Sequence, residues 1–387
     1  MRICPLVTVI LLLSTVGAAE VSTVYYLGDC LPTTSPIALI GDDPAINVIA
    51  VPATVHSGYF TYDEAKRALR LYLPRTYGEL LDGDLILLSD VRADTLPVKW
   101  LDWFSQSVED GGLGLLMIGG ILSFGGYSDS PPWDITSIGP LLPVDLVERQ
   151  TTSVPWKPVI VAEEDQLMTA LPWKTSPFFH GYNDVKIRDG ALLLAVTSDA
   201  KRNPFMASWN IGNGRSFAFC TDWTPGWGVD FMKWNYYPDL TVYAVYYSSG
   251  KEVPQDVELM HLLRSELINY KMQKDVLVSL INFVEKVGAN VVGLEMMIRD
   301  VDAIREEAGD LYIMQDYEEC VATLERGRRE LDRIEMEAVE VKARAFLWIW
   351  LIEWLAVSGA FMVTGTILWT LMIKRRLYRE VKTTRTF

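Results

Sequence analysis

The feature that most restricts this sequence is an apolar segment close to its C-terminus. Residues 346–373 contain one charged residue, Glu353, and end in twenty uncharged residues, enough to cross about 30 Å of hydrocarbon. Tryptophans lie near both ends of this segment, as at membrane interfaces, and the basic run Lys374–Arg376 follows directly. A buried helix is the alternative, and the basic stop disfavours it. We therefore predict a transmembrane helix over 346–373 and a basic cytoplasmic tail over 374–387.

The N-terminus has the pattern of a secretory signal peptide over residues 1–19. Arg2 precedes the apolar run Leu6–Val16, and the small residues Gly17–Ala19 offer a cleavage site. An uncleaved anchor is the alternative, although the apolar run is short for a membrane span. Both ends together predict a single-pass plasma-membrane protein whose N-terminal domain lies outside the cell.

Composition excludes some classes of partner. The chain has 387 residues, of which 50% are apolar, so it is too hydrophobic for a disordered protein. Its net charge is −15, and the part between signal and tail is more acidic still, because the tail is basic. Such a surface repels nucleic acid phosphates and anionic lipid headgroups, so we expect no nucleic acid among the partners. The membrane is expected as a partner because of the predicted span.

Cysteine usage gives no metal signal. Once Cys4 leaves with the signal, Cys30, Cys220 and Cys320 remain, without the spacing of a metal site. Three thiols cannot all pair within one chain. A disulfide between Cys30 and Cys220 is open in an exported protein. We predict no metal site and no cofactor.

Residues 20–250 alternate short apolar runs with helical patterns. Buried strands are expected over 24–27, 46–51, 84–90 and 113–118, and helices over 62–73 and 97–110. Apolar strands separated by helices indicate a parallel sheet covered on both faces. Phe205–Ile211 and Arg215–Phe219 flank Gly-Asn-Gly, which predicts a hairpin. The predicted fold is α/β, with a mostly parallel sheet and an antiparallel extension.

Residues 251–345 are charged and helical, and we predict a coiled-coil stalk of at least two helices, interrupted near Gly288 and Gly293. A heptad seam follows, with apolar or small residues three and four apart at Leu324, Gly327, Leu331, Ile334, Ala338, Val341, Ala345 and Trp348. The seam needs a partner. The preceding helix, 255–287, is one candidate.

A second copy of the chain is the other candidate partner for the seam. The span carries small residues four apart at Ala356, Ala360 and Thr364, which suit close helix packing. The seam continues into the span, where the earlier helix cannot follow. We therefore expect a homodimer through stalk and span.

The α/β region resembles the class I glutamine amidotransferase-like superfamily, in particular its uncharacterised "putative glutamine amidotransferase" branch. Three stretches carry the resemblance: "DLILLSDV" at 84–91, "GGLGLLMIGGILSFGGY" at 111–127 and "GNGRSFAFCTDWTPGWG" at 212–228. It covers about residues 20–250 and implies a flavodoxin-like, mostly parallel sheet. It also implies a nucleophilic cysteine in a glycine-rich turn, activated by a histidine.

This sequence departs from that catalytic pattern. No cysteine lies between Cys30 and Cys220, and Gly226 stands where the family often has a histidine. The catalytic candidates that remain are Ser123, past the apex of the turn, His180 in a loop, and Asp222. His56 and His261 are the other histidines, and both are expected to be structural.

The turn and the strand ends are the candidate ligand site. Gly119, Gly120 and Ile121 form the turn, whose glycines could serve folding alone or expose backbone N–H groups to an anion. Asp29 and Asp90 end neighbouring strands at the same sheet edge, where α/β proteins bind ligands. Carboxyl groups there could serve a metal ion or a hydrolytic water, or they could be simple helix caps.

Two functions follow from these expectations. In the first, the α/β domain is a non-catalytic module that binds a small ligand or a surface protein outside the cell. In the second, it is an extracytoplasmic hydrolase or amidotransferase-like enzyme with a non-standard site. An external position disfavours glutamine-dependent synthesis, because ATP lies inside the cell. We favour the first.

Overall fold

The structure, a computed structural model, describes residues 21–31, 33–53, 61–126 and 130–383. The predicted signal peptide therefore lies outside the described residues. The chain divides into two compact units, each treated separately below. The first takes in the described residues up to Ile268 together with Glu306–Thr323, and the second takes in Asn269–Arg305 and the chain from Leu324 onward.

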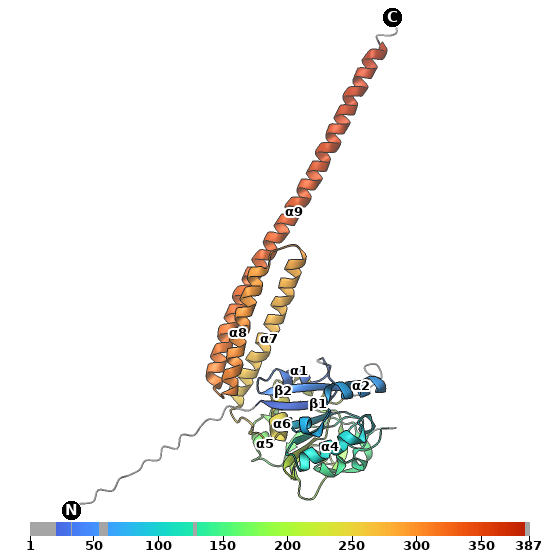
Figure 1. The fold of residues 1–387 in the computed structure, drawn as a ribbon, viewed down its shortest axis with the longest axis vertical. Helices are drawn as coiled ribbons and strands as arrows, with labels where there is room; N and C mark the ends of the chain where they lie inside the picture. Colours follow the sequence, from blue (N-terminus) through green and yellow to red (C-terminus); the bar gives the residue numbers. More distant parts are fainter. Residues whose placement is uncertain (1–20, 32, 54–60, 127–129, 384–387) are drawn as a thin grey trace, which may run out of the picture. The chain divides into compact units, whose positions relative to one another are not determined.

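A mixed eight-stranded sheet forms the centre of the first unit, with the strand order β2-β1-β3-β4-β10-β9-β8-β6 (Figure 1). The strands of this sheet are β1 (Ser22–Gly28), β2 (Ile46–Pro52), β3 (Leu85–Ser89), β4 (Gly114–Ile118), β6 (Pro158–Ile160), β8 (Leu192–Thr197), β9 (Pro204–Ile211) and β10 (Gly214–Phe219). Neighbours from β2 to β10 pair in parallel, and those from β10 to β6 pair antiparallel. The mostly parallel sheet with an antiparallel extension is confirmed.

Helices cover both faces of this sheet. They are α1 (Ile37–Gly41), α2 (Tyr62–Tyr72), α3 (Tyr77–Leu80), α4 (Val98–Glu109), α5 (Gln166–Thr169) and α6 (Tyr237–Ser248). Phe104 of α4 packs in the same cluster as Leu115 of β4, whereas Tyr247 of α6 packs on Phe217 of β10, with ring centroids 5.5 Å apart. Every residue of β3 and β4 is buried, as an apolar parallel strand requires.

The predicted hairpin is present between β9 and β10. Ile211 pairs with Gly214, so Gly212 and Asn213 form a two-residue turn. Gly212 has φ +56°, which an L-residue adopts at a cost and glycine adopts freely. A separate two-stranded sheet pairs β5 (Val144–Thr152) with β7 (Tyr182–Ile187) in antiparallel fashion.

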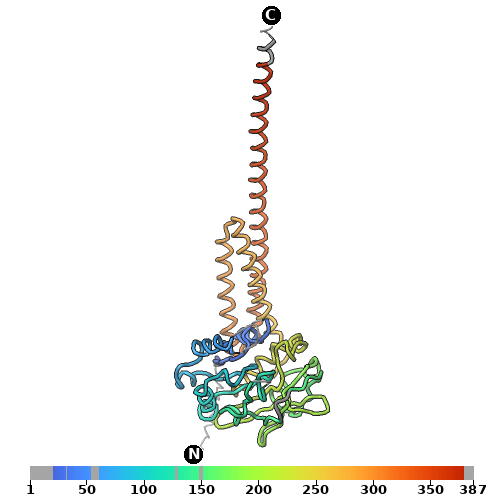
Figure 2. Tube along the Cα trace, turned by 90° about the vertical axis from the view of Figure 1, so that its right-hand side faces the viewer, coloured from blue at the N-terminus to red at the C-terminus, as the bar shows by residue number. Residues whose placement is uncertain are grey.

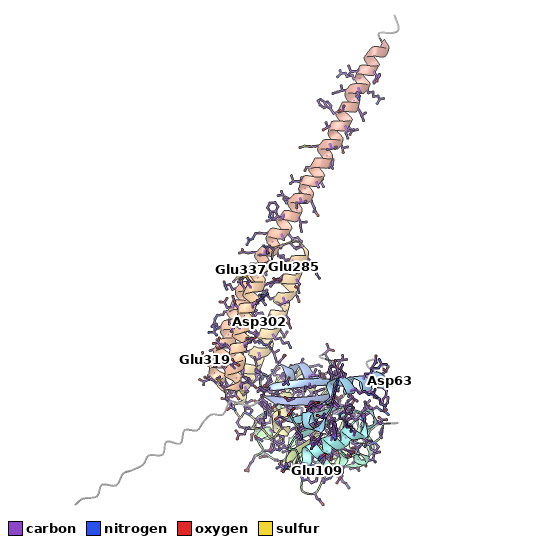
Figure 3. All side chains as sticks on the ribbon, in the orientation of Figure 1. Asp63, Glu109, Glu285, Asp302, Glu319 and Glu337 are labelled. Carbon is purple, nitrogen blue, oxygen red and sulfur yellow. The ribbon has the colours of Figure 1, made fainter. Side chains whose placement is uncertain are left out.

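Three long helices follow the α/β region: α7 (Val257–Lys286), α8 (Val292–Ile313) and α9 (Tyr317–Thr383). Gly288, at φ +86°, lies in the turn between α7 and α8. Within the second unit, the upper part of α7, the start of α8 and α9 run side by side (Figures 1 and 2). The Tyr270 hydroxyl of α7 donates to the Val301 carbonyl of α8 at 2.6 Å. Lys274 of α7 pairs with Asp302 of α8 (Figure 3).

The heptad seam of α9 is covered by the chain itself over its first half. Leu324, Leu331, Ile334 and Ala338 are all buried. A side chain at Gly327 would place its Cβ 2.6 Å from the Tyr270 ring, so the glycine lets α7 approach α9 closely. Packing against the preceding helix, the alternative considered for the seam, therefore accounts for this stretch.

The C-terminal part of α9 has the length and composition of a membrane span. Residues Tyr317–Tyr378 include an 18-residue stretch with a mean hydropathy of 1.8, none of which is buried. An exposed apolar helix of this kind is stable in hydrocarbon and unfavourable in water.

The described cysteines are all free thiols, so the disulfide considered between Cys30 and Cys220 is not formed. The Cys30 thiol donates to the Gly28 carbonyl at 3.6 Å. Cys220 is fully buried at the end of β10, and burial raises the pKa of its thiol. Cys220 is therefore held by packing in the core and not by a disulfide.

A buried ion network joins the first turns of α7 to the α/β region within the first unit. Arg264 of α7 donates to Asp239 of α6 at 2.6 Å and to Asp43, before β2, at 3.3 Å. Asp43 also accepts the hydroxyl groups of Tyr246 and Tyr312, at 2.7 and 2.6 Å. Both carboxylates are almost fully buried, so each depends on these partners for compensation.

We predict that Arg264→Ala lowers the free energy of unfolding by about 3–5 kcal/mol, because it leaves two buried carboxylates without their cation. Arg329→Ala is the matched control, since Arg329 makes only an exposed pair with Glu325 at 3.8 Å and should cost less than about 1 kcal/mol. Urea unfolding of the purified chain in detergent measures both. Equal costs for the two variants would contradict this view of the network.

Candidate functional site

The glycine-rich turn after β4 is shaped by its neighbours. A Cβ at Gly120, where φ is +146°, would lie 2.2 Å from the Asp90 Oδ1 atom. A Cβ at Gly119 would lie 2.5 Å from Asn183 Oδ1. Neither position can hold a side chain without moving these groups, so the glycines are explained by packing alone.

Asp90, directly after β3, fills the space that the glycines leave. Its backbone lies at φ +48°, an uncommon conformation for a residue with a side chain. Leu122 donates its N–H to Asp90 Oδ1 at 2.7 Å, and the N–H of Ser123 bonds the same carboxyl group. Two of the N–H groups predicted as a possible anion site are bonded elsewhere in the chain: Gly119 donates to the Phe219 carbonyl at 2.7 Å, and Gly120 donates to Asn183 Oδ1 at 3.0 Å.

Asn183 of β7 fixes the other side of the turn. Its Oδ1 accepts the N–H of Gly120 at 3.0 Å, and its Nδ2 donates to the Gly120 carbonyl at 2.9 Å. Asn183 was not among the residues predicted from the sequence. It lies three residues after His180, as the second residue of a largely buried strand, and a polar residue at such a position was the signal that could have identified it. Ile121, between these contacts, is half-buried.

The other two strand-end carboxyl groups bond within their own loops. Asp29 accepts the N–H of Leu31 at 2.9 Å and the hydroxyl of Thr34 at 2.5 Å. Asp222 accepts both the N–H and the hydroxyl of Thr224, at 2.8 and 2.7 Å. Both carboxyl groups therefore bond within turns of their own loops, and neither caps a described helix, the role considered for acidic strand ends.

Asp29, Asp90 and Asp222 nevertheless lie close enough to influence one another. Desolvation raises the pKa of Asp90 to about 8, and the charge of Asp222 adds to this rise. Desolvation likewise raises the pKa of Asp222, with a further contribution from Asp29. A Cβ at Gly226 would lie 2.6 Å from Asp222 Oδ2, so this carboxyl group occupies space beside Gly226.

The remaining catalytic candidates have other partners. Ser123 is 1% exposed, and its hydroxyl donates to the Ile118 carbonyl at 2.6 Å. His180 lies 2.8 Å from Asp230, with Nε2 facing Oδ2. His261 pairs in the same way with Asp239. Of the histidines that the structure describes, neither bonds Ser123; His56 lies outside the described residues.

The turn also lacks the helix of a nucleophile elbow. In that motif a strand, a sharp turn and a helix follow one another, and the nucleophile sits at the apex. Here the described chain after β4 continues into 3₁₀ turns at Trp133–Ile135 and Gly139–Leu141, and the next α-helix is α5. Within the described residues, no α-helix follows this turn directly. Leu122 and Ser123 instead bond Asp90.

Metal ligation has no support in the described ranges of the chain. Within them, no group of three or more His, Cys, Asp and Glu side chains is arranged to hold a metal ion. The three strand-end carboxyl groups influence one another electrostatically, but they do not converge on one ligand position.

Comparisons with known proteins identify the α/β region. Residues 53–247, about half of the chain, match a family described as "Putative glutamine amidotransferase". No curated protein matches the sequence. Two solved structures, described as cytoplasmic proteins from Salmonella typhimurium and its strain LT2, are each 20% identical with TM-scores of 0.48. They cover 58% of this chain and 98% and 99% of their own lengths.

A further similar structure is a β-galactosidase from Rahnella sp. R3. It is 13% identical, with a TM-score of 0.32, and the similarity covers 61% of this chain and 32% of that enzyme.

The raised pKa of Asp90 predicts a specific dependence of stability on pH. The folded state keeps a proton up to about pH 8, whereas an unfolded aspartate loses it near pH 4. The contribution of the Asp90 proton to the stability of the folded state is complete below about pH 4 and is lost as the pH rises towards 8. The free energy of unfolding should therefore fall over this window. Asp90→Asn should flatten part of that fall.

Urea unfolding between pH 5 and pH 8 measures this dependence. Glu109→Gln is the control, since Glu109 is exposed at the end of α4 (Figure 3) and its loss should leave the slope as in the parent. If the free energy of unfolding of Asp90→Asn had the same dependence on pH as that of the parent, the raised pKa would not belong to Asp90.

Proposed function

Because this chain belongs to the family described as "Putative glutamine amidotransferase", as its motifs predicted, we propose that it is a member without amidotransferase chemistry. In this proposal the α/β domain is a binding module for a small ligand or a surface protein, and it is held outside the cell by a membrane anchor.

The Asp90 carboxyl group in the turn is the observation that carries the proposal. Acyl transfer from glutamine needs a nucleophile at the turn and free N–H groups that stabilise the oxyanion of the intermediate. The sequence supplies no cysteine there, and the Leu122 N–H already donates to Asp90. The Ser123 hydroxyl donates to a backbone carbonyl. The candidate nucleophile, the Ser123 hydroxyl, and the candidate oxyanion donor, the Leu122 N–H, therefore both bond other groups of the chain.

The anchored, external position rests on the pattern at the two ends of the chain. The C-terminal part of α9 is apolar and unburied, and the basic run after it favours a cytoplasmic tail. The signal-like N-terminus supports export. A cytoplasmic description belongs to the two Salmonella proteins, which cover 58% of this chain.

One observation favours hydrolysis as a second candidate. Asp90 and Asp222 both have raised pKa values, and paired carboxyl groups of this kind serve as general acids and bases. Against this, the carboxyl oxygens of both residues already accept hydrogen bonds from their own surroundings. The non-catalytic module therefore remains the better-supported proposal.

Ammonia release from glutamine tests the proposal. The purified chain should release none above the background of a no-protein sample, because no nucleophile is free at the turn. Ser123→Ala should fold, with a stability loss of about 1 kcal/mol from the missing hydrogen bond. Ser279→Ala, at a hydroxyl on the exposed side of α7, is the matched control. Activity that is lost in Ser123→Ala and kept in Ser279→Ala would overturn the proposal.

A further inference from the structure

A second apolar stripe runs along α9, on the side away from the buried seam. Met336 follows the buried Ile334 by two residues, which is about 200° around a helix of 3.6 residues per turn. From Met336 the spacing alternates strictly between three and four residues. The positions are Met336, Val339, Ala343, Phe346, Trp350, Glu353, Val357, Ala360 and Thr364. A repeat that averages 3.5 residues is the signature of a helix seam.

The stripe is exposed where the first seam is covered. Met336, Val339 and Phe346 are 66%, 50% and 44% exposed, whereas Leu331 is fully buried. The Phe283 ring of α7 lies 6.3 Å from Phe346 and is itself 44% exposed. Together these side chains form an apolar ridge on the second unit, and a ridge of this kind is unfavourable in water without a partner.

Glu353 indicates that the partner also enters the membrane. It is the only charged residue of 346–373, and it lies in register with Val339 and Phe346, at intervals of seven residues. Ionisable groups in membrane helices face other protein segments in preference to lipid. The stripe therefore faces protein both above the membrane and at the start of the span.

We propose that this stripe, from Met336 to Thr364, is the surface on which a second copy of this chain packs in parallel. The inference rests on the proposed membrane anchor. Two anchored copies have the same orientation, so identical stripes meet in register and form a symmetric, self-complementary interface. Ala360 and Thr364 then allow close approach within the span. The dimer expected from the sequence is thereby assigned to this stripe, and the first seam is assigned to packing within the chain.

Disulfide crosslinking in native membranes tests the assignment. The full-length chain, with its own cysteines replaced by alanine, receives a single cysteine by Val339→Cys or Phe346→Cys. Two matched controls are Glu337→Cys, exposed on another face of α9 (Figure 3), and Leu331→Cys in the buried seam. Mild oxidation should give several-fold more dimer from the first two variants than from either control.

Other crosslinking results overturn the assignment. Dimers from Leu331→Cys and not from Val339→Cys would assign association to the first seam. If every variant gave only monomers, at every protein density, the chain would not self-associate and the proposal would be wrong. A product whose mass is not twice that of the chain would make the partner a different protein.

A charge variant and a topology control complete the experiment. Val339→Glu should reduce the dimer formed through Phe346→Cys several-fold, because two ionised carboxylates above the membrane then oppose each other. The two Glu353 side chains of the proposed dimer differ, since carboxyl groups that meet inside the span share a proton and do not both ionise. Glu337→Gln should leave the dimer unchanged. Protease added outside intact cells should leave the tail, 374–387, protected. If the tail were digested while the crosslinks still formed, the proposed orientation would be wrong and the proposed dimer surface would still hold.

Discussion

The hydrogen bond from the Leu122 N–H to Asp90 determines the geometry of the sheet edge. Asp90 holds an unusual positive φ to reach the turn, and its carboxyl group takes the space that a side chain at position 120 would need. Asn183 fixes the turn from the opposite side. Asp90 and Asn183 therefore bond the turn from opposite sides, which supports the proposed non-catalytic role.

Burial of Asp90 makes this arrangement depend on protonation. Desolvation of its carboxyl group raises the pKa to about 8, and the nearby charge of Asp222 adds to the rise. A neutral Asp90 still accepts the backbone N–H groups, and the repulsion is relieved. At the first turns of α7, the single cation Arg264 bonds both Asp43 and Asp239, and two tyrosine hydroxyls and His261 make the remaining contacts to these carboxyl groups. The fold thus buries carboxyl groups at two places and compensates them in two ways.

Elements whose cause is local could be predicted from the sequence. The continuous apolar runs gave β3 and β4, and Gly212-Asn213 gave the hairpin, because strand burial and turn chemistry act within a few residues. The placement of Asp29, Asp90 and Asp222 near one another at one sheet edge followed from the parallel sheet, although their carboxyl groups do not converge on one ligand position. The Asn183 contacts could not be predicted, since β7 belongs to a separate two-stranded sheet far along the chain. The heptad pattern alone could not predict that the Tyr270 ring lies against Gly327. This contact packs the first seam against α7.

The most direct test of the non-catalytic turn is covalent labelling of the folded chain. The chain is incubated with a fluorophosphonate, which reacts with activated serines, and separately with an electrophilic glutamine analogue, which reacts with activated thiols. Intact-mass measurement followed by peptide mapping then locates any adduct. The account predicts an unchanged mass in both cases, because the Ser123 hydroxyl and the N–H groups of Gly120 and Leu122 are already bonded within the chain. A single stoichiometric adduct on Ser123 would contradict it.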